Sequence, residues 1–167
     1  MIDLTGKVLV VVDMQPGYRQ CMTPEVIDAV ELLVREAVRA DSLVVFLEFL
    51  DGPTLSRLLR RVRRYDQFVI EQKQGCDGSA EVLAACERGL YDTSAFVVCG
   101  VDTHVCVRDT ARELASKMPG STVEVVKEAC GAEHGNKWHL FPRAHNLRAV
   151  SIGAVEHDRS AELEMAD

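Results

Sequence analysis

The sequence predicts an α/β fold, a three-layer αβα sandwich built on a six-stranded, mainly parallel sheet. Short apolar runs rich in Val, Ile and Phe recur along the chain, and segments of helical character separate them. The runs do not alternate between apolar and polar residues, which is typical of strands that helices cover on both faces. Strand and helix therefore alternate from end to end, as in parallel sheets with right-handed crossovers.

The first apolar run, residues 7–12 (KVLVVV), is the first expected strand. The other expected strands are residues 42–47, 67–70, 94–98, 122–126 and 147–152. Helical patterns cover residues 24–40, 55–62, 80–89 and 103–117, and a shorter helix is expected over 139–145. Pro24 after Thr23 favours a helix start, Gly89 is an expected C-cap, and Thr103 is an expected N-cap.

The length of 167 residues fits one domain, with an acidic tail from about residue 156 that we expect to fray. The net charge of −7 argues against a nucleic-acid partner. No secretory signal is apparent, and no apolar run approaches the roughly 20 residues that cross a bilayer, so we expect a cytoplasmic protein without a membrane partner. The six cysteines form no CxxC pair, so we expect free thiols and neither a metal nor a cofactor.

Chemistry-bearing residues follow the first and third expected strands. In parallel sheets, ligands bind beyond the carboxyl ends of the strands, where the strand order reverses. Asp13 directly follows the first strand, where a partly buried carboxylate needs a partner or a raised pKa. Lys73 lies at the end of the third strand. Each also has an ordinary interpretation, as a loop-capping aspartate and a solvated lysine.

Cys106 lies just beyond the fourth expected strand, in the first turn of the helix that follows Gly100. Backbone N–H groups and the positive end of the helix dipole favour a thiolate there. The same N–H groups can hold an oxyanion. The alternative is a small core residue at a helix start, because free cysteines are often buried.

Four segments resemble the isochorismatase-like cysteine hydrolases, which include nicotinamidases, N-carbamoylsarcosine amidases and ureidoacrylate hydrolases. Residues 100–107 (GVDTHVCV) are similar to the family's G-V-x-T-x-x-C-V segment, and residues 10–15 (VVVDMQ) are similar to its first strand and D-x-Q ending. Lys73, followed by Asp77 and Gly78, has the family's position between them. Residues 123–129 (VEVVKEA) resemble its fifth strand.

The resemblance implies that residues 1–167 form one hydrolase domain. It implies that Cys106 is the nucleophile, Asp13 the base that takes its proton, and Lys73 the cation that fixes Asp13 and lowers the thiol pKa. It also implies a cis peptide at Val101–Asp102 and an oxyanion hole formed by the backbone N–H groups of Asp102 and Cys106. Relatives are commonly dimers or tetramers, so a homo-oligomer is expected. The expected substrate pocket holds Gln15, Tyr18, Phe49, His104 and Trp138.

The implied reaction is hydrolysis of a C–N bond in a small amide, ureido or carbamoyl compound through a thioester. The chain lacks the Asp-x-His metal motif of nicotinamidases, since no histidine precedes His104, and this disfavours a metal-dependent nicotinamidase. Ser79 stands where relatives often have Phe, and the segment between strands two and three is short. An inactive binding or assembly protein of the same fold is therefore the alternative function.

Two further interpretations stay open. A nucleotide-binding α/β domain fits the alternating pattern, although no Gly-rich phosphate loop follows the first strand. The second concerns a dense basic helix, which is either a solvated face paired with acidic residues or a surface for anions or a second subunit. Its residues are Arg57, Arg60, Arg61, Arg63 and Arg64.

Overall fold

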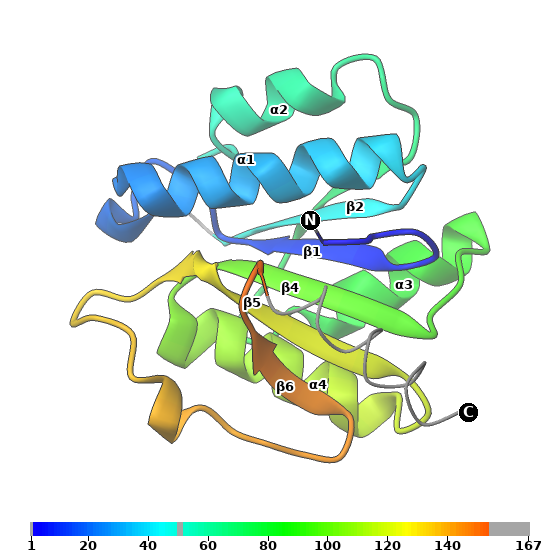
Figure 1. Ribbon diagram of the computed structural model, residues 1–167. Coiled ribbons are helices and arrows are strands. Elements are labelled where there is room, and N and C mark those ends of the chain that lie inside the picture. Colours follow the sequence, from blue (N-terminus) through cyan, green and yellow to red (C-terminus); the bar gives the residue numbers. More distant parts are fainter. Residues whose placement is uncertain (1, 50–51, 154–167) are drawn as a thin grey trace, which may run out of the picture.

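The computed structural model describes residues 2–49 and 52–153, which form an α/β fold with one six-stranded sheet (Figure 1). The strand order is β3-β2-β1-β4-β5-β6, and every neighbouring pair is parallel. The predicted fold class is therefore confirmed. The strands are β1 (Val8–Val12), β2 (Val44–Glu48), β3 (Phe68–Gln72), β4 (Ala95–Val101), β5 (Thr122–Gly131) and β6 (Leu147–Val150).

Four α-helices make the outer layers, with α1 and α2 on one face of the sheet and α3 and α4 on the other (Figure 1). Three short helical turns join the elements. The helices are α1 (Pro24–Arg39), α2 (Ser56–Val62), α3 (Ser79–Gly89) and α4 (Arg108–Lys117), and the turns are η1 (Arg19–Met22), η2 (Thr103–Val107) and η3 (Trp138–Leu140). Within the described residues, no helix is long and apolar enough to span a membrane.

Burial on both faces explains the continuous apolar run of β1, all five residues of which are buried. Helix α1 contributes a stripe at helical spacing, in which Val30, Leu33 and Ala37 are at most 1% exposed. A fully buried Val or Leu side chain contributes roughly 1.5–3 kcal/mol. Apolar burial thus stabilises the central strands, and these strands position the loops at their carboxyl ends.

Strands β4 and β5 are longer than the sequence predicts, because their pairing resumes after an irregularity. The register shifts between Val98 and Gly100, and Gly100 then pairs with Cys130 and Val101 with Gly131. Gly100 has φ +119°, and a Cβ there would lie 2.1 Å from the Val12 carbonyl oxygen. The backbones of β4 and β1 therefore pack closely at Gly100, at the point where the strand order reverses.

Three predictions about helices are wrong. The residue in the left-handed region after α3 is Leu90 (φ 55°), and Gly89 instead makes room for the Tyr91 ring, which a Cβ would meet at 2.2 Å. The helix expected over 139–145 is only the η3 turn, because Pro142 follows two residues after its end and disfavours a helical conformation at Phe141. The N-cap before the fourth helix is Asp102 rather than Thr103. The acidic tail lies outside the described residues.

Candidate active site

Asp13 and Lys73 meet at the carboxyl edge of the sheet, as their positions after β1 and β3 predict. Asp13 Oδ2 lies 2.9 Å from Lys73 Nζ, and both side chains are fully buried. Lys73 Nζ also donates to the Gly75 carbonyl at 2.9 Å and lies 4.5 Å from the centre of the Phe49 ring. The lysine is therefore held by a carboxylate, a carbonyl and an aromatic face, and it is not the solvated side chain of the ordinary interpretation.

Cys106 reaches the same carboxylate from the η2 turn. Its thiol is within hydrogen-bonding range of Asp13 and only 8% of the residue is exposed. Beyond Lys73 and Cys106, neither oxygen of Asp13 has a hydrogen-bond partner among the described residues. The peptide bond between Val101 and Asp102 is cis. Three residues from three separate strand ends thus form one buried cluster.

The proton of Cys106 is held more tightly than the sequence suggests. Burial raises the pKa of the thiol, and the Asp13 carboxylate raises it further, to about 12, although the Lys73 ammonium acts in the opposite direction. Burial also raises the pKa of Asp13, and the hydrogen bond and charge of Lys73 oppose that rise. Lys73 thus acts in the expected direction on the thiol pKa, but burial and the nearby Asp13 carboxylate outweigh it, so the net change in the thiol pKa is upward.

The Asp102 side chain fixes the turn that carries Cys106. Its Oδ1 accepts from the His104 N–H at 2.8 Å, and its Oδ2 accepts from the Glu133 N–H at 3.0 Å and from Gln20 Nε2 at 3.3 Å. One carboxylate thus joins three segments of the chain. The sequence singled out Asp102 only for its backbone, because Glu133 and Gln20 are distant from it in the sequence.

Two further bonds tie the same turn to the loop after β5. Thr103 Oγ1 donates to Asn136 Oδ1 at 2.6 Å, and Asn136 Nδ2 donates to the Cys130 carbonyl at 2.8 Å. The Lys137 N–H donates to His104 Nε2 at 2.9 Å. Consecutive residues of the turn therefore bind consecutive parts of one loop. Asn136 and Gln20 were missed by sequence reasoning, since polar loop residues carry no local signal of such contacts.

Gln15 does not face a substrate space. It is fully buried, its Oε1 accepts from the Phe49 N–H at 2.8 Å, and its Nε2 donates to the Gly52 carbonyl at 2.5 Å. Buried Glu48 acts beside it, accepting from the Thr54 N–H at 2.6 Å and from Gln72 Nε2 at 2.6 Å. Both residues shape the loop after β2, and through that loop they position the Phe49 ring against Lys73.

Two of the other three expected pocket residues line cavities whose walls do not include Asp13, Lys73 or Cys106. His104 lines a cavity of about 410 Å³ with Val105, Arg108 and Leu140, whose walls do not include that cluster. Trp138 lines another cavity, of about 430 Å³, beside β6. Tyr18 is half-buried against the core, and its carbonyl accepts from the Cys21 N–H at 3.1 Å. Phe49, in contrast, contacts the cluster directly, through Lys73.

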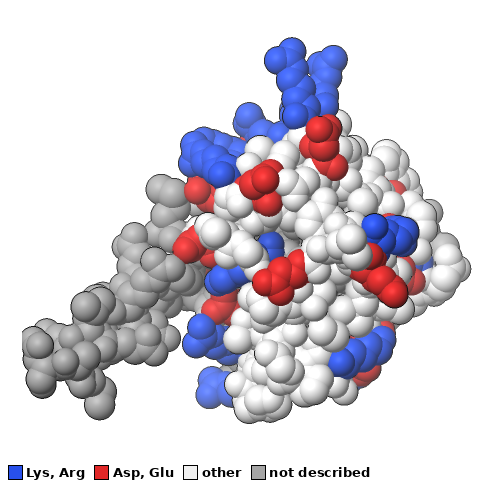
Figure 2. Space-filling view, turned by 90° about the vertical axis from the view of Figure 1, so that its right-hand side faces the viewer, with Lys and Arg blue, Asp and Glu red and all other residues white. Residues whose placement is uncertain are grey.

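The basic helix α2 is partly explained by ion pairs with α1. Arg57 contacts Asp28 at 2.6 Å, and Arg57 and Arg61 both pair with buried Glu31. Basic side chains also project at the top of the molecule, over α2 (Figure 2). Arg60, Arg63 and Arg64 are exposed there. Pairing with acidic residues thus describes Arg57 and Arg61, and the surface for anions or a second subunit stays a prediction.

Ser79 occupies its position without the aromatic ring expected from the resemblance. It is buried, its hydroxyl donates to Asp77 Oδ2 at 3.0 Å, and Lys117 Nζ donates to it at 2.6 Å. The change from Phe is thus accommodated by a polar network between α3 and α4. In the described parts of the chain, no three His, Cys, Asp or Glu side chains gather as metal ligands.

Comparison with known proteins gives the family. The model of the Isochorismatase domain matches residues 7–149, and the chain belongs to this family. No curated protein sequence matches the chain.

Solved structures share the fold at low sequence identity. N-carbamoylsarcosine amidase from Thermoplasma acidophilum is 18% identical, with 87% of this chain and 95% of that chain covered and a TM-score of 0.67. Nicotinamidase/pyrazinamidase PncA from Bacillus subtilis is 14% identical, with 86% and 98% covered and a TM-score of 0.69. MAR1 ribonuclease from Caenorhabditis elegans is 23% identical, with 78% and 67% covered and a TM-score of 0.67.

Proposed function

We propose that this protein is a cysteine hydrolase that cleaves a C–N bond of a small amide, ureido or carbamoyl compound. The observation that carries the proposal is the buried Asp13 carboxylate, which lies between the Lys73 ammonium and the Cys106 thiol. A nucleophile beside a base that a third group orients is the arrangement that covalent catalysis needs. Membership of the isochorismatase family, with amidases among its structural neighbours, supports the same class of reaction.

In the first half of the reaction, the Cys106 sulfur attacks the carbonyl carbon and Asp13 takes the thiol proton. A thiol with a pKa of about 12 is protonated at neutral pH. Proton transfer during the attack therefore avoids a free thiolate. Lys73 balances the Asp13 charge until the proton arrives. The proton then passes to the leaving nitrogen, the C–N bond breaks, and a thioester on Cys106 remains.

In the second half, water attacks the thioester carbon and Asp13 accepts a proton from that water. The C–S bond breaks, and the proton returns to the Cys106 sulfur. In both halves negative charge develops on the carbonyl oxygen, and the backbone N–H groups of Asp102 and Cys106 are the proposed donors to it. Removing one such donor typically costs about 10²–10³ in rate.

The test is release of ammonia or amine from a panel that includes nicotinamide, N-carbamoyl amino acids and ureido acids. Cys106→Ala should lower kcat/KM by at least about 10³-fold on any substrate found. Cys76→Ser is the matched control and should retain activity, because Cys76 is an exposed thiol on the neighbouring loop. Mass spectrometry of rapidly quenched reactions should detect the acyl group on Cys106.

Activity that survives in Cys106→Ala within about 10-fold would rule out the covalent mechanism. A chain that binds panel members without turning any of them over, and that forms no acyl adduct, would favour the inactive binding protein of the same fold. This second function is considered because Ser79 stands where relatives often have Phe.

A further inference from the structure

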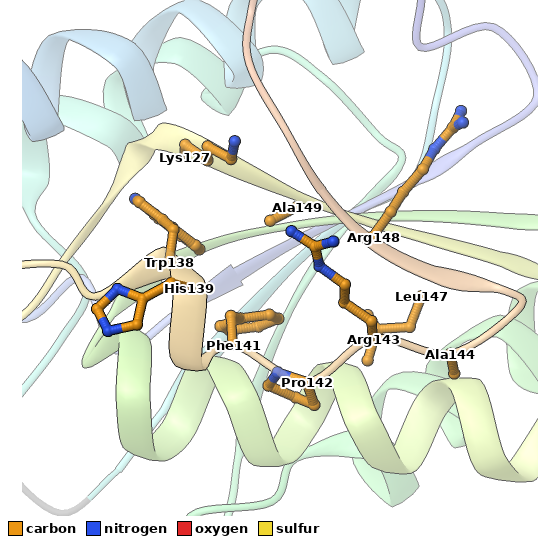
Figure 3. A pocket seen from close by; sticks show the side chains of 10 residues that line it. All are labelled: Lys127, Trp138, His139, Phe141, Pro142, Arg143, Ala144, Leu147, Arg148 and Ala149. Atoms are coloured by element: carbon orange, nitrogen blue, oxygen red, sulfur yellow. The ribbon is translucent and has the colours of Figure 1, made fainter.

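A cavity of about 430 Å³ lies beside the edge strand β6, apart from the catalytic cluster. Its walls include Lys127 from β5, Trp138 from η3 and Ala149 from β6 (Figure 3). Phe141 and Arg143, from the segment between η3 and β6, also line it. None of Asp13, Lys73 and Cys106 lines it. The volume falls within the range of roughly 300–1,000 Å³ that small-molecule sites occupy.

Two cations line this cavity without an acidic partner among the residues that the structure describes. Lys127 is half-buried and Arg143 is exposed, and neither forms an ion pair with any residue that the structure describes. Arg148 differs, because it contacts Glu124 at 2.7 Å and its side chain points away from the other two in Figure 3. Uncompensated positive charge in a hollow of a chain with net charge −7 favours an anionic ligand.

Aromatic side chains form another part of the wall. The rings of Trp138 and Phe141 lie 5.4 Å apart between centroids, tilted by 48°, and Phe141 is buried beneath the cavity. Leu147 and Ala149 of β6 add apolar surface. Such walls suit a flat ring, since aromatic groups prefer tilted or offset contacts with one another.

We propose that this cavity binds a small aromatic carboxylate. Its ring contacts Trp138 and Phe141, and its carboxylate pairs with Arg143 and Lys127. Arg143 is the main anchor, because a guanidinium group matches a carboxylate with two parallel hydrogen bonds. The proposal does not depend on the proposed hydrolase function, because the cavity and the catalytic cluster share no residue.

The chain contains its own reporter, because Trp138 is its single tryptophan. Benzoate is the probe, and benzamide is the neutral compound of the same shape. Benzoate should change the Trp138 fluorescence in a saturable manner and bind at least about 10-fold more tightly than benzamide. Isothermal titration calorimetry gives the same affinities without relying on fluorescence.

Variants locate the site. Arg143→Ala and Lys127→Ala should each weaken benzoate binding by about 10-fold or more, whereas Arg60→Ala, which removes an exposed arginine from α2, should not change it. Cys106→Ala should also leave it unchanged, which separates this site from the active site. Absence of saturable binding, equal affinity for benzamide, or benzoate binding that Arg143→Ala leaves intact would each overturn the proposal.

Discussion

Asp13 and Lys73 form an ion pair of 2.9 Å that no solvent reaches, although the two residues lie 60 positions apart in the sequence. Burying two charges costs several kcal/mol per ion, and their attraction offsets this only with good geometry and further bonds. Lys73 has further contacts with Gly75 and Phe49, whereas Asp13 has, within the described part of the chain, only Cys106 as a further partner. A carboxylate with so few partners is well suited to accept a proton.

Asp13→Asn should raise the reactivity of Cys106 toward iodoacetamide, even though it removes the proposed base. The Asp13 carboxylate raises the pKa of the thiol and the Lys73 ammonium lowers it, so the amide leaves the lowering influence unopposed. Alkylation of Cys106 should then begin at lower pH than in the wild-type protein. Peptide mass spectrometry over a pH series measures this change.

Lys73→Met is the opposite variant and should push Cys106 alkylation to still higher pH. The exposed thiol of Cys76 serves as the internal control in both variants, because neither substitution should much change the pH at which Cys76 is alkylated. If Asp13→Asn slows alkylation instead, the carboxylate does not hold the thiol proton and the assignment of Asp13 as base loses its support.

Lys73→Met should also destabilise the fold by about 3–5 kcal/mol at pH 7, because it leaves the buried Asp13 charge unpaired. The pKa of Asp13, already raised by burial, should rise further without Lys73. A carboxylate with a raised folded-state pKa binds protons in the folded state at pH values where the unfolded chain has lost them. The variant should therefore be most stable under acidic conditions and lose stability as the pH rises above 3.8, the ordinary value for Asp13.

Urea unfolding of Lys73→Met at several pH values measures this trend. The double variant Asp13→Leu/Lys73→Met is the control, since it replaces the pair with apolar groups and should recover most of the lost stability. A double variant as unstable as the single one would mean that the loss comes from packing and not from charge.

The sequence predicts that Asp13, Lys73 and Cys106 come together, because strand ends in a parallel sheet converge at one edge. The prediction fails where long-range contacts decide the geometry. The buried amide of Gln15 binds a loop 34 residues away, and the thiol pKa of Cys106 is raised because burial and the Asp13 carboxylate together outweigh the Lys73 ammonium. Neither outcome has a local signature, since both depend on how distant loops meet.

Gly100→Ala should prevent the site from forming. The added Cβ would lie 2.1 Å from the Val12 carbonyl oxygen, in a backbone conformation with φ +119°. Backbone strain alone costs about 1–3 kcal/mol, and the clash with β1 adds to it. Thermal unfolding monitored by circular dichroism should show a large loss of stability or no folded protein. Gly120→Ala, where no atom lies within 4 Å of the added Cβ, should behave like the wild type.

Glu124 of β5 forms ion pairs with Arg148 of β6 and with Lys7 just before β1. Its contribution to the free energy of unfolding should depend on pH. Burial raises its pKa, but Arg148 and Lys7 together bring the pKa below the ordinary value of 4.5. A lowered folded-state pKa stabilises the fold above pH 4.5, and this contribution is lost as the pH falls. Glu124→Gln should cost about 1–3 kcal/mol at pH 7 and progressively less under acidic conditions. Exposed Glu87→Gln should show no such change in urea unfolding.

Asn136→Ala should impair catalysis more than stability, because Asn136 connects the loop after β5 to the turn that carries Cys106. The substitution removes the partner of the buried Thr103 hydroxyl and the bond to the Cys130 carbonyl. We expect a loss of about 1–2 kcal/mol in unfolding free energy and at least a 10-fold fall in kcat.

Asn146→Ala is the matched control. It removes three bonds to carbonyls around the end of α4, and it should lower stability at least as much while leaving kcat unchanged. If both variants lose kcat in proportion to stability, the loop does not position the catalytic turn.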